Sequence, residues 1–371
     1  MERSGRLYAV CMGLIRNLPR CRFAVGAALI AAIAMTASAS AERRNFIGYY
    51  PSWLSVEAKP LAATSPAYSH VVVAFARPDF SWDGKSWSGT GLQFDVPPAV
   101  IKTQIHALQA RGTRVLLAVG GATYLQWAPL AAEAGKAGAI TAALTRFVEA
   151  MGFDGIDVDY ERDGATPEVV GEYRAAIAAL RQAANGKLLS LAAWSTGADC
   201  TPATDNTACG GQFTLAGGSA GRERLVLGDS ETLSQIDVVN VMAYDAGVAQ
   251  FDPVKAWKLY RALLPSRVTV NIGFEIAPEG WGGATLVQDD AAASCKSAKI
   301  TQDQFGNQVH KSYSIQHGLL DGPLAPGPNS NAADGAMLWH IVKDQKLPRC
   351  GQRAVLSPQA LEKAAAMLLG R

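Results

Sequence analysis

The stretch Phe-Asp-Gly-Ile-Asp-Val-Asp-Tyr-Glu (153–161) places four carboxylates within eight positions, separated mostly by apolar residues. Alternate residues of a β-strand share a face, so Asp157, Asp159 and Glu161 lie on one face and the apolar residues between them on the other. A solvated acidic segment is not interleaved in this way, and a surface helix does not alternate with period two. The stretch therefore predicts a buried strand with a ladder of three acids, spaced by about 6–7 Å, and Glu161 at its carboxyl end.

The chain around this stretch alternates between short apolar runs and helical patterns. The runs are rich in Val, Ile, Leu and aromatic residues, as buried parallel strands are. The eight strand candidates are 45–50, 68–76, 113–121, 153–161, 187–195, 236–245, 267–275 and 335–342. Eight strand–helix repeats in roughly 300 residues predict an α/β fold, a single-domain (β/α)8 TIM barrel. A doubly wound open sheet is the alternative, but no GxGxxG turn follows the first candidate strand.

The connection 276–334 is the longest between two strand candidates. It contains a possible helix over 285–298, and a segment rich in Pro, Gly and Asn over 321–335 that is typical of an irregular loop. Long loops on a rigid scaffold often carry function, so we expect a substrate-facing loop between the seventh and eighth strands.

In a barrel of this kind the acidic face of 153–161 points inward, and catalysis takes place at the carboxyl ends of the strands. Three carboxylates so close together cannot all ionise at low cost, so at least one holds a proton near neutral pH. General acid catalysis requires such a group at the mouth of the barrel, and Glu161 is the uppermost of the three. Asp154 lies on the opposite pleat, where we expect it to bind nearby backbone instead of substrate.

The first 41 residues have the composition of a secretory signal peptide. A basic region with five Arg precedes the apolar run Phe23–Ala37, and small residues at 37–39 and 39–41 form two overlapping cleavage sites. A membrane anchor is the alternative, but the run is shorter than the roughly 20 residues of a spanning helix. We therefore expect removal of 1–41, a mature chain over 42–371 without a membrane segment, and a secreted or periplasmic location.

The mature chain is expected to be close to neutral. Loss of five Arg and one Glu with the leader leaves 29 basic and 31 acidic side chains, which changes the formal net charge from +2 to −2. Such a surface gives no electrostatic reason to bind nucleic acid or an anionic membrane, and it suits a neutral substrate. The five His are scattered without a metal-ligand pair, and no cofactor motif is present, so we expect a monomer without metal or cofactor.

Four cysteines remain after the leader: Cys200, Cys209, Cys295 and Cys350. An even number in an exported protein indicates disulfides, for which three connectivities exist. The polar stretch between Cys200 and Cys209 is typical of a loop, which favours that pair and leaves Cys295 for Cys350. Four free thiols or a zinc site are the alternatives, but the CxxC spacing of zinc sites is absent.

The opening stretch resembles the DGxDxDxE signature of glycoside hydrolase family 18, the chitinases and endo-β-N-acetylglucosaminidases. The matching residues are Asp154, Gly155, Asp157, Asp159 and Glu161. Three other strands are similar to the family's in the same order: 46–50 to its first strand, LLAVGG (116–121) to the SxGG of its third, and MAYD (242–245) to the MxYD of its sixth. Trp339 stands at the place of the family's floor tryptophan, so the resemblance spans about 45–342.

The resemblance implies a substrate-assisted retaining mechanism, one of the exceptions to the two-carboxylate scheme. Glu161 is then the acid that protonates the glycosidic oxygen, and later the base that activates water. The 2-acetamido oxygen of the substrate attacks its own anomeric carbon, while Asp159 holds the acetamide N–H and Asp157 shares a proton with Asp159. Tyr244 binds the acetamide oxygen.

The resemblance also implies that Met242, Asp245 and Trp339 bind substrate, with Met242 and Trp339 on the floor of the −1 subsite. Trp194 and Trp281 come near the carboxyl ends of strand candidates, where we expect aromatic rings to stack on sugars.

Two departures from the family pattern concern the site. Ala118 stands where the family has the serine of SxGG, a donor to the inner aspartate. We therefore expect weaker stabilisation of ionised Asp157, with Tyr49 as a remaining donor, but no loss of the reaction. The segment NIGFEIAPEGW (271–281) does not match the GxPxYGR of large processive chitinases, so the sequence leaves the outer subsites and processivity open.

The function expected from these residues is a secreted hydrolase of β-1,4-linked N-acetylglucosamine polymers, that is, chitin or chitooligosaccharides. An endo-β-N-acetylglucosaminidase acting on glycoprotein or peptidoglycan-type glycans shares the motif and is an alternative. A non-catalytic chitin-binding lectin on the same fold is another, but such lectins usually lack the acid, and Glu161 is present.

Overall fold

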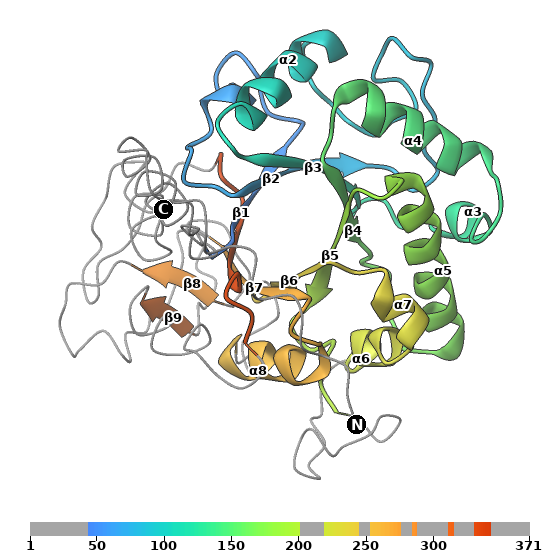
Figure 1. The fold of residues 1–371 in the computed structure, drawn as a ribbon, viewed down its shortest axis with the longest axis vertical. Helices are drawn as coiled ribbons and strands as arrows, with labels where there is room; N and C mark the ends of the chain where they lie inside the picture. Colours follow the sequence, from blue (N-terminus) through green and yellow to red (C-terminus); the bar gives the residue numbers. More distant parts are fainter. Residues whose placement is uncertain are drawn as a thin grey trace, which may run out of the picture. The chain divides into compact units, whose positions relative to one another are not determined.

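The computed structural model describes residues 44–200, 219–244, 253–275, 284–287, 311–314 and 330–342. Eight parallel strands in this part form a closed barrel (Figure 1): β1 (Phe46–Pro51), β2 (His70–Ala76), β3 (Arg114–Gly120), β4 (Gly155–Asp159), β5 (Leu188–Trp194), β6 (Val238–Met242), β7 (Thr269–Glu275) and β10 (Gly335–Trp339). Successive strands pair from β1 to β7, and β10 pairs with both β7 and β1, which closes the sheet. The predicted (β/α)8 TIM barrel is confirmed, with a strand in each of the eight predicted places.

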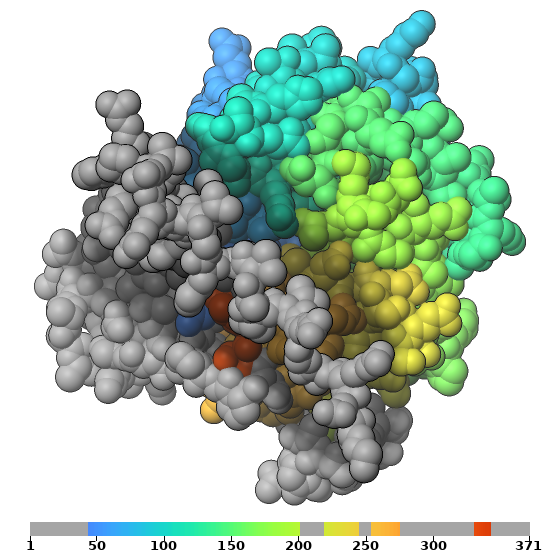
Figure 2. Space-filling view, viewed as in Figure 1, coloured from blue at the N-terminus to red at the C-terminus, as the bar shows by residue number. Residues whose placement is uncertain are grey.

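Helices cover the outer side of the barrel (Figure 1), and their segments, coloured from cyan to yellow, form much of the visible face in the space-filling view (Figure 2). They are α2 (Pro98–Gln109), α3 (Ala128–Ala131), α4 (Ala139–Met151), α5 (Pro167–Ala184), α6 (Arg222–Leu227), α7 (Ser230–Ser234) and α8 (Pro253–Leu263). The first crossover, from β1 to β2, contains only the 3-10 turn η1 (Leu61–Ala63). The sequence defines the first helix poorly, and the structure has a short turn in its place.

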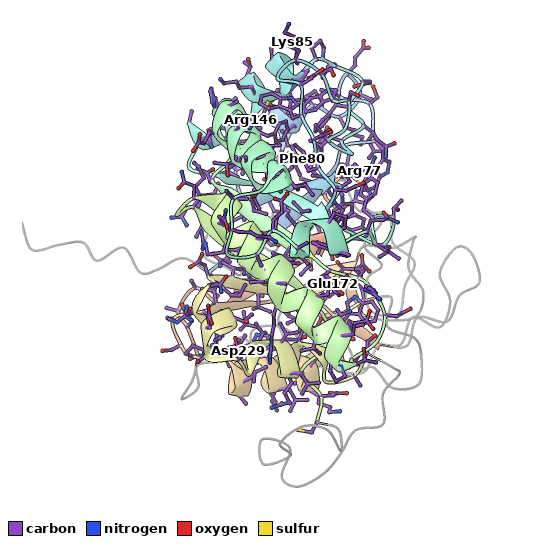
Figure 3. The ribbon with its side chains drawn as sticks, turned by 90° about the vertical axis from the view of Figure 1, so that its right-hand side faces the viewer. Arg77, Phe80, Lys85, Arg146, Glu172 and Asp229 are labelled. Atoms are coloured by element: carbon purple, nitrogen blue, oxygen red, sulfur yellow. The ribbon has the colours of Figure 1, made fainter. Side chains whose placement is uncertain are left out.

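The longest helix, α5, shows how the local sequence sets the helix ends. Thr166 precedes it, and its side chain accepts a hydrogen bond from the amide of Val169, while Pro167 provides a first residue that needs no amide partner. Asn185 ends the helix in the left-handed conformation with φ 47°. One side of α5 packs on β4 and β5. Figure 3 shows Glu172 on this helix and Arg146 on the neighbouring α4, in the outer layer.

Apolar side chains form two separate cores. The larger lies between the strands and the helices, and the smaller lies inside the barrel. The inner core consists of Ile47, Tyr49, Val72, Ala74, Leu116, Ala118, Val238 and Met337. It is small because β4 to β7 contain buried polar side chains, which pair as Asp157 with Ser190 and as Asn240 with Asn271. The barrel interior is therefore apolar on one side and polar on the other.

The connection between β7 and β10 contains two further short strands, β8 (Ala284–Val287) and β9 (Lys311–Ser314). They extend the sheet in parallel from β7. The helix predicted over 285–298 is therefore wrong at its first three residues. Thr285 and Val287 are β-branched and favour extended backbone, and pairing with β7 fixes that choice.

Several predictions concern residues outside the described ranges. These are the leader 1–41, Asp245, Trp281, Cys209, Cys295 and Cys350. Cys200 is buried and disulfide-bonded, but both predicted pairings stay predictions because the other cysteines are outside those ranges. Among the described residues, no helix has the length and apolarity needed to cross a membrane.

A buried ion pair holds the amino-terminal end of the barrel. Arg261 of α8 donates to Asp334 (3.0 Å) and to the carbonyl of Val268 (2.9 Å). Asp334, just before β10, also accepts from the amides of Val270 (2.7 Å) and Asn331 (3.0 Å). The pair thus connects α8, β7 and β10 at the point where the barrel closes.

We predict that Asp334→Ala lowers the free energy of unfolding by about 3–5 kcal/mol, because it leaves the Arg261 charge buried without its partner. Urea denaturation measures this loss. Glu168→Ala is the matched control, because it removes the exposed carboxylate of the Arg162–Glu168 pair (3.6 Å), and exposed pairs contribute about 0–1 kcal/mol. Equal effects of the two substitutions would contradict the role given to Asp334.

Candidate active site

The three acids of 153–161 rise along β4 as the sequence predicts. Asp157 and Asp159 are buried inside the barrel, with 0% and 3% of their surface exposed. Glu161 lies just beyond the strand end and is half-buried. Asp159 and Glu161 both line a cleft of about 670 Å³ at the carboxyl ends of the strands, and Asp157 lies one pleat repeat below.

Two hydroxyl groups hold Asp157. The Tyr49 hydroxyl donates to its Oδ2 over 2.8 Å, as expected, and the Ser190 hydroxyl donates to its Oδ1. Ala118 and Ser190 lie directly opposite Asp157 on the two neighbouring strands, β3 and β5. Ser190 therefore supplies, from the other side, the donor that the sequence analysis expected to be missing at Ala118.

Sequence reasoning missed Ser190, although it is a single hydroxyl within the apolar strand LLSLAAW. Ser190 alternates with the outward-facing residues of the strand, so the period-two pattern alone predicts that its hydroxyl lies on the inner face. Its pairing with Asp157 depends on the register between β4 and β5, and that register is not encoded in either strand alone.

Burial changes the protonation of the two aspartates. Burial raises the pKa of Asp157 from 3.8 to about 6, while the hydrogen bonds from Ser190 and Tyr49 lower it. Burial and the charges of Glu161 and Asp157 raise the pKa of Asp159 well above its ordinary value. Both shifts favour the protonated form of the aspartates, and the sharing of one proton between Asp157 and Asp159 stays a prediction.

An aromatic wall forms one side of the cleft, and we define it as Trp53, Phe75 and Trp339. Each ring contacts the other two: the ring centroid of Phe75 lies 6.1 Å from that of Trp53 and 5.6 Å from that of Trp339, and the two tryptophan centroids are 6.3 Å apart. Trp53 is 43% exposed, which is high for so large an apolar side chain. Such exposed, stacked rings present flat apolar faces on which a sugar ring can lie.

Residues from β5 and β6 lie elsewhere in the same cleft. Met242 and Tyr244 line it as expected, with the Tyr244 hydroxyl 3.9 Å from the sulfur of Met337. Trp194 also lines the cleft, and the guanidinium of Arg222 lies 4.5 Å from its ring centroid. The structure thus brings these three predicted residues together with Asp159 and Glu161.

A polar rim completes the cleft, and sequence reasoning did not identify it. It consists of Gln93, Thr123, Tyr124, Asp163, Ser195, Thr196 and Ser219. These residues follow the strands in loops without periodicity or motif, so no local signal predicts their convergence. Asp154 has the expected structural place: its Oδ2 accepts from the amide of Val115 (2.7 Å) and from Gln109 (2.9 Å).

No cluster of three or more His, Cys, Asp or Glu suited to a metal ion occurs among the residues that the structure describes. The chemical groups at the cleft are therefore a half-buried carboxyl at its mouth, a buried aspartate pair with raised pKa values, a tyrosine hydroxyl and an aromatic wall. This set can donate a proton to a leaving group, stabilise a developing positive charge and bind a ring with one apolar face.

Comparison with known proteins gives concordant matches. The sequence profile described as glycosyl hydrolases family 18 matches residues 45–341. A chitinase of Plasmodium falciparum (isolate 3D7) is 33% identical over 130 residues, and the match covers 32% of this chain and 32% of the relative. The chain thus matches about a third of the length of that curated relative.

Two solved structures share the fold. A GH18 chitinase from Pseudoalteromonas aurantia has a TM-score of 0.53 at 17% identity, with 87% of this chain and 99% of that chain covered. The GH18 chitinase ChiB from the chitin utilization locus of Flavobacterium johnsoniae has a TM-score of 0.53 at 16% identity, with 88% and 94% covered. At such identities the likeness concerns the barrel fold.

We predict that Ser190→Ala raises the pKa of Asp157 above about 6, because a hydrogen bond to a carboxylate favours its charged form. Titration of isotope-labelled aspartate by carbon NMR measures the change. Addition of Ala118→Ser to this variant restores a hydroxyl on the opposite strand and is expected to bring the pKa back down. Ser69→Ala, which removes a buried hydroxyl bonded to the carbonyl of Phe46, is the control. An Asp157 pKa unchanged by Ser190→Ala would contradict the role of Ser190.

The raised pKa of Asp157 also predicts a pH dependence of stability. Folding favours the protonated form, so this contribution to stability is fully present below 3.8 and is lost as the pH rises through about 6. Asp157→Asn cannot titrate, so its free energy of unfolding does not decrease for this reason between pH 3.8 and about 6. Urea unfolding of this variant and of wild type over that pH range measures the difference in free energy.

Asp83 provides a control of opposite sign. Hydrogen bonds from the amides of Ser86 and Lys85 lower its pKa to about 2, so its contribution is present above 3.8 and is lost as the pH falls. Asp83→Asn therefore changes the slope of the free energy of unfolding against pH in the direction opposite to Asp157→Asn. Parallel pH curves for wild type and Asp157→Asn would show that burial of Asp157 has no such cost.

Proposed function

Because this chain belongs to glycoside hydrolase family 18, we propose that it hydrolyses the β-1,4 bonds of N-acetylglucosamine polymers, that is, chitin and chitooligosaccharides. The observation that carries the proposal is the joint placement of Glu161, Asp159 and the aromatic wall in one cleft. A neutral, ring-shaped substrate with apolar faces suits that wall and the nearly neutral mature chain.

The first step breaks the glycosidic bond. Glu161 donates its proton to the glycosidic oxygen, and the bond between that oxygen and the anomeric carbon breaks. The 2-acetamido oxygen of the same sugar forms a new bond to the anomeric carbon, which gives a cyclic oxazolinium ion and releases the leaving sugar as an alcohol. No protein nucleophile takes part, in agreement with the exceptions known to the two-carboxylate scheme.

Asp159 stabilises that ion. In the free protein, burial and neighbouring charges raise the pKa of Asp159, whereas a positive charge that develops beside Asp159 lowers it and favours transfer of a proton to Asp157. Transfer of the proton to Asp157 leaves Asp159 negative beside the acetamide N–H and the developing positive charge. Tyr244 binds the acetamide oxygen, and its half-buried position in the cleft lining supports this role.

The second step restores the enzyme. Water attacks the anomeric carbon and gives its proton to Glu161, now a carboxylate, and the ring of the oxazolinium ion opens. Two displacements at one carbon return the original configuration, so the product has the β-configuration. Trp339 and Met242 support the sugar at this subsite, and Trp194 and Trp53 offer further surfaces for neighbouring sugars.

Further parts of the proposal concern the protein before and after export. We propose that 1–41 is removed as a signal peptide and that the mature protein is a secreted or periplasmic monomer. The supporting observations are the basic and apolar composition of the leader and the buried, disulfide-bonded Cys200. Sequencing of the amino terminus and non-reducing peptide mapping of exported protein check the cleavage and the pairs Cys200–Cys209 and Cys295–Cys350.

Product analysis tests the function. Purified mature protein is incubated separately with chitooligosaccharides, cellooligosaccharides and a high-mannose glycoprotein. We predict cleavage of the first only, because cellooligosaccharides have the same linkage but lack the acetamide nucleophile. Release of the glycan from the glycoprotein would favour the endo-β-N-acetylglucosaminidase alternative. Binding of chitooligosaccharide without any product would favour a lectin.

In the same assay Glu161→Gln is expected to lower kcat on the order of 10²–10⁴-fold, because glutamine keeps the shape of the side chain but cannot donate the proton. Calorimetry is expected to show that chitooligosaccharide still binds. Glu149→Gln is the matched control, since Glu149 is exposed on α4 and contacts Asn185 (3.1 Å), away from the cleft lining. A wild-type rate in Glu161→Gln would remove Glu161 from the mechanism.

A further inference from the structure

Arg222, the first residue of α6, lies beneath the segment that carries Glu161. Its side chain is fully buried. One guanidinium nitrogen donates to the carbonyl of Arg162 (2.6 Å), and another donates to the carbonyl of Tyr160 (3.1 Å). These are the two carbonyls on either side of Glu161 in the sequence. The planar fork of arginine can bind both at once, which a lysine ammonium on a flexible stem cannot do with the same geometry.

The segment around Glu161 has no regular secondary structure of its own. β4 ends at Asp159, and α5 begins at Pro167. Between them, Glu161 depends on hydrogen bonds from outside the segment to fix its backbone. The two bonds from Arg222 lie closest to it in sequence, and the amide of Gly164 adds a bond to Ser219 (2.8 Å).

The same guanidinium supports the cleft through Trp194. It lies 4.5 Å from the Trp194 ring centroid and 5.2 Å from that of Tyr173, within the range of cation–π contact. Trp194 lines the cleft together with Glu161. A single buried cation thus contacts both the backbone on either side of the proposed acid and an aromatic surface of the proposed substrate site.

Glu223 balances the charge of Arg222. Its Oε1 accepts from two nitrogens of Arg222 and from the amide of Trp194 (3.4 Å), and it is also fully buried. Burying such a pair is costly, and apolar residues of similar volume often serve a fold equally well or better. Stability alone therefore does not explain the presence of this pair at the carboxyl end of β4.

Resting on the proposed hydrolase function, we propose that Arg222 is a positioning residue for the general acid: by binding the carbonyls of Tyr160 and Arg162 and stacking on Trp194, it holds Glu161 at a set distance from the bound sugar. It touches no substrate itself. Its loss is expected to affect the step that needs the proton, since misplacement of a catalytic group by about 1 Å can cost 10²-fold in rate.

Leaving-group dependence tests this proposal. A chitooligosaccharide needs protonation of its leaving sugar, whereas a 2,4-dinitrophenyl β-glycoside of chitobiose releases a stable anion without it. We expect Arg222→Lys and Arg222→Met to lower kcat about 10²-fold on the oligosaccharide, as loss of general acid catalysis does, but only a few-fold on the dinitrophenyl substrate. KM for both substrates is expected to change little, and Glu161→Gln provides the reference pattern.

Arg261→Lys is the matched control. Arg261 is also a buried arginine with an acidic partner and bonds to backbone carbonyls, but it lies at the amino-terminal end of the barrel. This variant is expected to lower the free energy of unfolding without changing the ratio of the two kcat values. A loss in the Arg222 variants that is equal on both substrates, or absent, would overturn the proposal, and so would failure of both Arg222 variants to fold.

Cleavage of the two substrates by the wild-type protein distinguishes failure of the positioning role of Arg222 from failure of the proposed hydrolase function. If wild type cleaves neither substrate, the hydrolase proposal itself is wrong. If wild type cleaves both and the Arg222 variants behave like Arg261→Lys, only the positioning role is wrong.

Discussion

The cost of burying two aspartates inside the barrel is the constraint on which the rest of the site depends. Asp157 and Asp159 have almost no exposed surface, and a carboxylate without solvent needs hydrogen bonds or a proton. Tyr49 and Ser190 donate hydrogen bonds to Asp157, and burial raises the pKa of both aspartates, which favours a proton on the pair. The two donors come from β5, which pairs with β4, and from β1, which does not.

The inner surface of the barrel is polar on the side of the two aspartates and apolar on the other side. Around β4 to β7 it carries Asp157, Ser190, Asn240 and Asn271, and towards β10, β1 and β2 it becomes apolar and then aromatic. The aromatic wall comes from parts of the chain nearly three hundred positions apart, because β10 closes the sheet beside β1. Closure of the barrel therefore places an apolar ring surface opposite the acids, which is the arrangement that a sugar with polar edges and apolar faces needs.

Among the described residues, two buried arginine–carboxylate pairs lie at opposite ends of the barrel. Arg261 and Asp334 connect elements where the chain closes the sheet, and Arg222 and Glu223 lie under the segment that carries Glu161. The chemistry of the two pairs is the same, but their surroundings differ. In TIM barrels the amino-terminal end serves stability and the carboxyl-terminal end serves catalysis, and the division between these two pairs follows that rule.

Local patterns in the sequence predict the barrel, its eight strands and the order of the acids on β4, because period-two alternation and strand–helix repeats are local signals. The resemblance to the family pointed to Met242, Tyr244 and Trp339, which line the cleft, and Tyr49 was expected as a donor to Asp157. Tertiary packing sets three further arrangements: Ser190 faces Asp157, Trp53 and Phe75 pack beside Trp339, and Arg222 supports the segment that carries Glu161. These contacts depend on register between neighbouring strands and on loop paths, which long-range pairing sets and no single segment of the chain encodes.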